Sequence, residues 1–183
     1  MLKLEGNNIY LRPVRPSDAE SIYRYARHRE ISRYTYVPYP YRLEDSYAFL
    51  KSLRRWRKKG TSEVFGIIDK SSHRLLGLIG MHRIDRVNRR VEIGYWLGKE
   101  HWGKGFTSDA VRLVVRYAFK DMKLQKVVAR VWHPNIASAK LLQKCGFKLE
   151  GRLRRQTFRN NRWYDELMFG ILKQEFKVDS RKQ

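Results

Sequence analysis

Residues 92–108, EIGYWLGKEHWGKGFTS, form the most informative stretch of the chain. The pattern predicts a strand over 90–97 that runs into a turn with glycine at 103 and 105, followed by a helix. The first turn of a helix leaves N–H groups without partners, and the helix dipole makes that end positive. Because glycine lets the backbone come close to a ligand, this turn is typical of a site that cradles pyrophosphate.

Two common phosphate-binding motifs are absent from the sequence. There is no G-x-G-x-x-G with an acidic residue about 20 positions further on, which disfavours a dinucleotide fold. There is also no G-x-x-x-x-G-K-[ST] of a Walker loop. Lys104 adds positive charge, and Thr107 and Ser108 can cap the helix or donate hydroxyls to phosphates. A tight turn without a ligand is the alternative that this motif alone leaves open.

On both sides of this stretch the chain alternates strands and helices, with no linker, repeat or low-complexity segment. The expected strands cover 8–15, 63–69, 74–84, 90–97, 125–132, 147–158 and 163–172, the last two joined through Asn160 and Asn161. The expected helices cover 17–28, which opens on a capping box at Ser17, and 43–58, 107–120 and 136–145. Short polar turns between the central strands favour antiparallel pairing. The order predicts an α+β fold with a mixed, mostly antiparallel sheet of six to seven strands and about four helices.

The composition is that of a folded globular protein. The chain has 183 residues, 42% of them hydrophobic, which predicts one domain over 1–183 with a charged tail over about 174–183. Cys145 is the only cysteine, which excludes an internal disulfide framework and a thiolate metal cluster, and we expect it to be buried. The histidines show no metal-ligand spacing, so no metal is expected. No apolar run reaches about 18 residues and no signal core is present, so we expect a cytoplasmic protein without membrane contact.

The charge of the chain is strongly unbalanced. Lys and Arg number 40 against 18 Asp and Glu, which gives a net charge of +22. Such an excess suits phosphate, on RNA, on DNA or on a nucleotide cofactor, and it disfavours a polyamine ligand. The alternative is a solvated surface with no such partner.

Two segments resemble one known family. Residues 92–110, EIGYWLGKEHWGKGFTSDA, are similar to the strand, the Q/R-x-x-G-x-G/A loop and the helix of the GNAT superfamily of acyl-CoA-dependent N-acetyltransferases. Residues 135–151, NIASAKLLQKCGFKLEG, resemble its second signature segment, and 9–19, IYLRPVRPSDA, its opening. Within the superfamily the chain most resembles the branch that acetylates the N-termini of ribosomal proteins, whose members also modify amino acids and small amines.

The resemblance implies acetyl-CoA as cofactor. It places the strand with Tyr95, Trp96 and Leu97 where it separates from its neighbour, with its backbone groups against the pantetheine arm. It places the loop and the helix start against the pyrophosphate, and two residues of the next helix beside the cofactor. Trp102 and Thr107 depart from the loop pattern, but backbone N–H groups do the binding. The implied cofactor residues are Tyr95, Trp96, Leu97, Trp102, Gly103, Lys104, Gly105, Phe106, Thr107, Ser108, Asn135 and Ser138.

The reaction that the resemblance implies requires a neutral amine, so a base must remove a proton. Glu92, on the strand just before the cofactor segment, is the predicted base through a water, and a surface glutamate is the alternative. A donor must stabilise the developing negative charge. Many relatives use a tyrosine where this chain has Leu142, so Ser138 is the predicted donor, with a bond to its own helix as the alternative. Thr157 stands where some members of the branch have a second carboxylate.

The acceptor is expected between the loop 34–41, the helix 43–58 and the basic hairpin 152–166. The predicted acceptor-binding residues are Tyr34, Tyr36, Tyr39 and Arg155. An aromatic wall and an arginine-rich hairpin suit a protein N-terminus beside RNA phosphate on a ribosome, although solvated arginines are the alternative.

Three functions stay open from the sequence. The favoured one is transfer of an acetyl group to the N-terminal α-amine of a protein. A small-molecule amine acetyltransferase would need an acidic pocket, for which Glu44, Asp45, Asp165 and Glu166 are available. A non-catalytic RNA-binding module on the same fold would use the basic hairpin. The resemblance also makes a homodimer a reasonable expectation, although no interface is evident in the residues.

Overall fold

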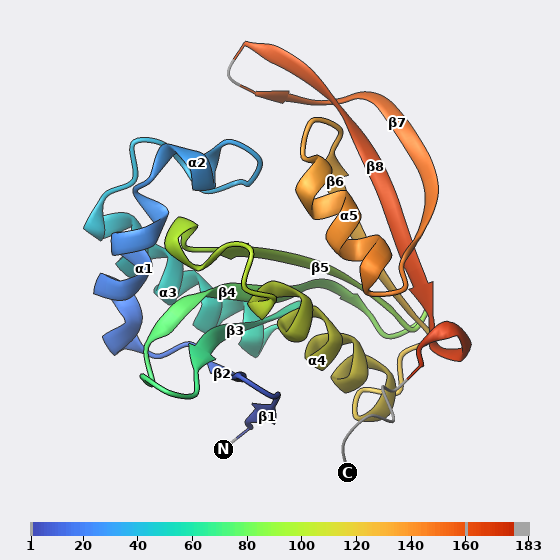
Figure 1. Ribbon diagram of the computed structural model, residues 1–183, viewed down its shortest axis with the longest axis horizontal. Helices are drawn as coiled ribbons and strands as arrows, with labels where there is room; N and C mark the ends of the chain where they lie inside the picture. The colour runs from blue at the N-terminus through green and yellow to red at the C-terminus, as the bar shows by residue number, and fades with distance from the viewer. Residues whose placement is uncertain (1, 160, 178–183) are drawn as a thin grey trace.

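The centre of the molecule is one eight-stranded sheet in the order β1-β2-β3-β4-β5-β6-β8-β7 (Figure 1). The computed structural model describes residues 2–159 and 161–177. The strands are β1 (Leu4–Glu5), β2 (Ile9–Pro13), β3 (Ser62–Asp69), β4 (Leu75–Asp85), β5 (Arg90–Leu97), β6 (Lys126–Trp132), β7 (Lys148–Arg159) and β8 (Arg162–Leu172). The helices are α1 (Ala19–Ala26), α2 (Arg29–Ser32), α3 (Leu43–Lys58), α4 (Phe106–Lys120) and α5 (Ile136–Lys144), with short 3-10 turns at Pro16–Asp18, Lys99–His101 and Lys173–Glu175.

Helices cover both faces of the sheet. Successive side chains of a strand point to opposite faces, so Ile67 is buried in the core under α4 and Ile68 in a second core under α1 and α3. In α4, Val111, Val114 and Ala118 are fully buried against the strands. Burying each of the two valine side chains stabilises the fold by about 1.5–3 kcal/mol.

β5 and β6 are the only neighbouring strands in the described sheet that run parallel, and they separate along their length (Figure 1). Their pairing extends from Arg90 opposite Lys126 to Ile93 opposite Ala129 and then stops. The second half of β5 continues to pair with β4, and the second half of β6 with β8. The sheet therefore opens between β5 and β6, and α4 connects the two strands.

The architecture confirms the predicted α+β class and the mostly antiparallel mixed sheet. The bounds of β5 and α3 match the predicted ranges. The sheet has eight strands instead of six to seven, partly because the two-residue strand Leu4–Glu5 pairs with β2. The four-residue helix α2 was also not predicted. Elements this short contain about one period and no repeat of it, so a pattern of hydrophobic residues cannot reveal them.

The start of the first helix differs from the prediction. A capping box at Ser17 is wrong, because residues 16–18 form a 3-10 turn and α1 begins at Ala19. Asp18 is buried and accepts hydrogen bonds from the Arg12 guanidinium at 2.8 Å and from the Arg15 N–H at 2.7 Å. The ion pair with Arg12 therefore determines the position of this turn.

The C-terminal end of the described chain packs on the core. Lys173–Glu175 form a 3-10 turn, and the Phe176 ring lies 5.8 Å from the ring of Phe119. Residues 178–183 of the predicted tail, and Asn160 of the predicted turn, lie outside the described residues. Within residues 2–159 and 161–177, no helix is both long enough and apolar enough to cross a membrane.

Candidate active site

A cavity of about 1050 Å³ lies where β5 and β6 separate. Its walls come from β4, β5, β6, the segment 33–38, α3 and the start of α5. The sequence-predicted residues that line it are Tyr34, Tyr36, Glu92, Tyr95, Trp96, Leu97, Trp102, Gly103, Thr107, Asn135 and Ser138. The cavity thus brings together the predicted base, the predicted donor, part of the glycine loop and part of the tyrosine loop.

The glycine loop leads directly into α4. Gly103 and Gly105 have φ angles of +75° and +83°, in the left-handed region that favours glycine, and Gly105 is the N-cap of α4. A Cβ atom at either position would meet nothing within 4 Å, so there is open space beside the backbone. Trp102 anchors the loop, since its Nε1 donates to the Leu97 carbonyl at 2.6 Å. A pyrophosphate group fits here, because the first turn of α4 has free N–H groups, its end is positive, and there is open space beside the loop.

β5 leaves one backbone edge free where it separates from β6. The Gly98 N–H donates to the Leu76 carbonyl, and the alternation of an antiparallel ladder then directs the backbone of Trp96 to β4. The backbone groups of Tyr95 consequently face the gap, where an extended amide chain can add like a strand. Trp96 also lines the cavity, but its backbone groups pair with β4 and do not face the gap. These features fit the pantetheine arm of acetyl-CoA.

Ser138 meets Tyr95 across the gap. The Ser138 Oγ lies 2.9 Å from the Tyr95 hydroxyl, and the Ser138 N–H donates to Asn135 Oδ1 at 3.2 Å. Burial raises the pKa of Tyr95, so the phenol is neutral and holds its proton. The Ser138 hydroxyl is thus held by a neighbouring strand, and Asn135 acts as the N-cap of α5.

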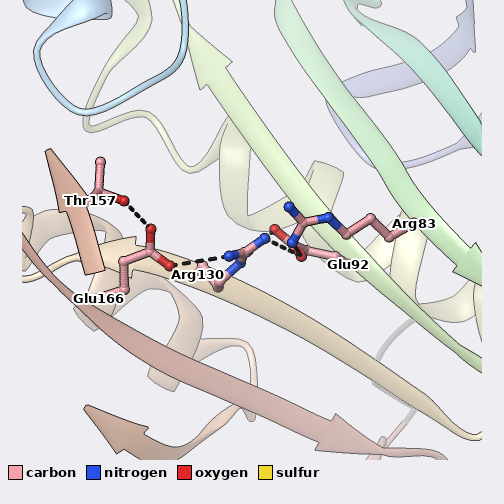
Figure 2. A network of polar contacts seen from close by, with 5 residues as sticks. All are labelled: Arg83, Glu92, Arg130, Thr157 and Glu166. Atoms are coloured by element: carbon pink, nitrogen blue, oxygen red, sulfur yellow. Dashed lines mark hydrogen bonds and ion pairs between the residues drawn. The ribbon is translucent and has the colours of Figure 1, made fainter. Parts of the chain in front are cut away.

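Glu92 belongs to a network of charged side chains on the other side of β5 (Figure 2). The Arg130 guanidinium donates to both Glu92 oxygens at 3.0 Å, and Arg83 donates to Oε2 at 2.9 Å. Arg130 also donates to Glu166 at 3.3 Å, and the Thr157 hydroxyl donates to the same carboxylate. Arg130, on β6, therefore bridges a glutamate from each of the two strands beside it, β5 and β8.

The network carries no net charge, because two arginines face two glutamates. Burial raises the pKa of Glu92, as does the charge of Glu166, whereas Arg83 acts in the opposite direction. A carboxylate has about four acceptor sites, and the arginines occupy three of those of Glu92. Among the described residues, the remaining acceptor site, on Oε1, receives no hydrogen bond.

Aromatic side chains form one end of the cavity, where the sequence predicted the acceptor. The Tyr36 ring meets Trp132 edge-on at 5.5 Å, and Trp132 stacks on Tyr164 at 5.4 Å. From the β7–β8 hairpin, Arg159 donates to the carbonyls of Thr35 and Val37. The hairpin and the tyrosine loop are therefore tied together at this end of the cavity.

Several predicted residues do not line the cavity. Tyr39 is 56% exposed, and the backbone N–H of Arg155 donates to Asp165 at 2.7 Å. Ser108 and Cys145 are buried beside α5, with the Cys145 thiol 3.7 Å from the Ser108 carbonyl, and burial raises the pKa of that thiol. The cavity lining in the described part of the chain omits Lys104, Gly105, Phe106, Ser108, Tyr39 and Arg155.

Sequence reasoning missed Arg130 and did not connect Glu166 to Glu92. Arg130 interrupts the apolar run KVVARVW of β6, between two buried residues. A charged residue in a strand that is otherwise apolar is a signal, because such a residue needs a partner. Glu166 could not be paired with it from sequence, since their contact depends on the β6–β8 register.

Known proteins that are similar to this chain are acetyltransferases, whose cofactor the site geometry fits. Residues 8–148 match the family model of the acetyltransferase (GNAT) domain. The uncharacterized N-acetyltransferase p20 of Bacillus licheniformis is 32% identical over 176 residues, 96% of this chain and 99% of that protein. The ribosomal-protein-serine acetyltransferase of Escherichia coli is 31% identical over 108 residues, 59% of each chain.

Among solved structures, spermidine N-acetyltransferase from Vibrio cholerae in complex with CoA and spermine superposes with a TM-score of 0.81. It is 26% identical, and the match covers 92% of this chain and 97% of that one. The family match spans most of the chain, and the glycine loop, the free edge of β5 and the start of α5 fit the cofactor. The chain therefore belongs to the GNAT acetyltransferase family and transfers an acetyl group from acetyl-CoA to an amine.

Proposed function

We propose that the acceptor is the N-terminal α-amine of a protein. The observation that supports this most is that each of the four carboxylates lining the cavity, among the described residues, already has a partner. Glu92 and Glu166 share Arg130, Glu30 pairs with Lys99, and Asp45 accepts the Arg42 N–H at 2.7 Å. A cationic acceptor would have to compete with these partners.

The charge and the lining suit a peptide better than a polyamine. A polyamine carries several positive charges, and a chain of net charge +22 repels it. A peptide N-terminus brings a single amine, and its backbone and first side chains can pack on Tyr34, Tyr36 and Trp132. The Escherichia coli relative, a ribosomal-protein-serine acetyltransferase, supports the same acceptor, whereas the Vibrio cholerae spermidine N-acetyltransferase supports the competing one.

In the proposed reaction two groups of the chain act on opposite sides of β5. A water at the free acceptor site of Glu92 takes one proton of the incoming ammonium and passes it to the carboxylate. The neutral amine then attacks the thioester carbonyl of acetyl-CoA, the C–N bond forms and the C–S bond breaks. Coenzyme A leaves as a thiolate, which takes up the second proton of the amine. The Ser138 hydroxyl, held by Tyr95, presents a hydrogen-bond donor on the side of α5 where negative charge develops. The cavity walls hold the amine in position.

Steady-state kinetics with two acceptors tests the proposal. We expect kcat/KM to be higher for a short peptide with a free N-terminal serine or alanine than for spermidine. We also expect Glu92→Gln to lower kcat by about 10²–10⁴-fold, as for loss of a general base. Glu20→Gln, an exposed carboxylate on α1, is the matched control and should behave like the wild type. A higher kcat/KM for spermidine would overturn the proposed acceptor.

A further inference from the structure

α3 has two opposite faces with different surroundings. Asp45, Phe49 and Trp56 face inward and line the acceptor cavity. Tyr47, Lys51, Arg54 and Lys58 are all exposed, and their i, i+4, i+7, i+11 spacing places them in one stripe on the opposite side of the helix. We call these four residues the outer stripe of α3.

Positive charge is concentrated at this end of α3. Its second half and the residue that follows carry six exposed cations, namely Lys51, Arg54, Arg55, Arg57, Lys58 and Lys59. Across the part of the chain that the structure describes, none of the six forms an ion pair. The acidic residues of α3, Glu44 and Asp45, lie in its first turn. The outer stripe therefore presents uncompensated charge for about two turns of helix.

Two arginines of the β7–β8 hairpin, Arg152 and Arg159, differ in this respect. Arg152 pairs with Asp165 at 2.6 Å, and Arg159 holds the carbonyls of the tyrosine loop. These side chains already have a structural task, so they are less available to an external anion than the cations of α3.

We infer that the outer stripe of α3 is a docking surface for the phosphate backbone of single-stranded RNA. A cation on each turn suits a chain of phosphates, and Tyr47, 54% exposed, offers a ring on which a base can stack. The stripe lacks the apolar face by which a helix lies on a membrane. The inference rests on the proposed acceptor, because a new protein N-terminus emerges at the ribosome, beside RNA. α3 would then hold RNA on one face and the acceptor cavity on the other.

Fluorescence anisotropy with a labelled 20-nucleotide single-stranded RNA tests the inference between 50 and 200 mM KCl. The variant Lys51→Gln/Arg54→Gln/Lys58→Gln keeps helix propensity nearly unchanged. We expect it to bind more weakly and to reduce the slope of log affinity against log salt by about 2, since three phosphate contacts are lost. Tyr47→Ala should weaken binding at least about fivefold with the same salt slope, because it removes stacking alone.

A second triple variant, Arg86→Gln/Arg154→Gln/Arg162→Gln, removes the same charge from other exposed positions and should bind RNA like the wild type. Equal losses in both triple variants, tighter binding of duplex DNA, or binding only to phosphatidylserine vesicles would overturn the inference. Acetylation of a free peptide should be unchanged in the α3 variant. If the peptide is not acetylated by the wild type, the proposed acceptor fails, whereas loss of the RNA difference removes only the docking surface.

Discussion

Ser138 and Tyr95 come from opposite walls of the cavity, and their hydroxyls meet at 2.9 Å. Leu142, at the position on α5 where many relatives have a tyrosine, is fully buried in the core. The hydroxyl of Ser138 is thus oriented by a strand and not by its own helix. We regard Tyr95 as the positioning residue and Ser138 as the donor.

Tyr95→Phe removes the hydroxyl and leaves the ring in place. We expect kcat to fall about three- to tenfold, the value of one neutral hydrogen bond, with little change in KM for the peptide. Ser138→Ala should lower kcat further, and the double variant should be no slower than Ser138→Ala alone, because both act through one group. Steady-state kinetics of the three variants measures this. Additive losses would show that Tyr95 does not act through Ser138.

Arg130 holds two glutamates at once, and its removal leaves both without their main partner. Glu166 is 1% exposed, so Arg130→Met should lower the free energy of unfolding by about 3–5 kcal/mol. Adding Glu166→Gln should recover part of this loss by removing one of the uncompensated charges. Urea denaturation measures both, with Arg154→Met on the exposed hairpin as the control. A loss as small as that of the control would contradict the role of Arg130.

The sequence indicated some of these residues and not others for a physical reason. Glu92 and Ser138 lie in motifs whose spacing is local, and both line the cavity as expected. The bridge from Glu92 through Arg130 to Glu166 joins three strands. Such contacts depend on strand order and register, which a local pattern does not contain.

Among the elements, the loop 98–105 has the clearest link between backbone and function. Both of its positive-φ glycines border open space at the start of α4. Gly60 ends α3 with a φ of +66° and also has nothing within 4 Å, but it lies away from the cavity lining. Substitutions at the three glycines can therefore distinguish two effects. The strain of a side chain at positive φ is expected at all three, whereas an effect on cofactor binding is expected only at Gly103 and Gly105.

Gly103→Ala and Gly105→Ala should raise KM for acetyl-CoA, because a methyl group enters the space for pyrophosphate. Each should also destabilise the fold by about 1–2 kcal/mol, the cost of a left-handed conformation for a non-glycine residue. Gly60→Ala should show the same destabilisation with an unchanged KM. Kinetics and thermal unfolding of the three variants measure this. An unchanged KM in both loop variants would argue against a phosphate site here.

The turn between β3 and β4 predicts a pH effect. Asp69 accepts hydrogen bonds from Ser71 and Ser72, which lower its pKa from 3.8 to about 2. A lowered pKa in the folded state stabilises the protein above pH 4, and this contribution is lost as the pH falls toward 2. Asp69→Ala should cost under about 1 kcal/mol at pH 7, since the site is exposed. Urea denaturation should show the difference shrinking toward pH 2, and a constant difference would contradict it.

The predicted bounds of an element agree with the observed ones where its hydrophobic period is strong. The helix 43–58 and the strand 90–97 are long and patterned, and their observed bounds agree with those predicted. The short β1 and α2 are too short to repeat a period, and the turn at Asp18 contains an ion pair with Arg12. Tertiary contacts set these parts of the chain, so local propensity could not place them.

For the whole molecule, the opening between β5 and β6 connects fold and function. One wall carries the cofactor loop and Glu92, and the other carries Trp132 and the start of α5. The resemblance implied both motifs and a strand that separates from its neighbour, and the structure shows where the pairing stops, after Ile93 and Ala129. The chain around this opening has a net charge of +22, which disfavours an acceptor with several positive charges.

The most direct measurement is transfer of label from isotope-labelled acetyl-CoA in a ribosome-containing lysate of the host, read by mass spectrometry. Label should appear on protein N-termini with the wild type and be strongly reduced with Glu92→Gln and Ser138→Ala. Label found only on small amines, or on no acceptor at all, would contradict acetyl transfer to a protein α-amine.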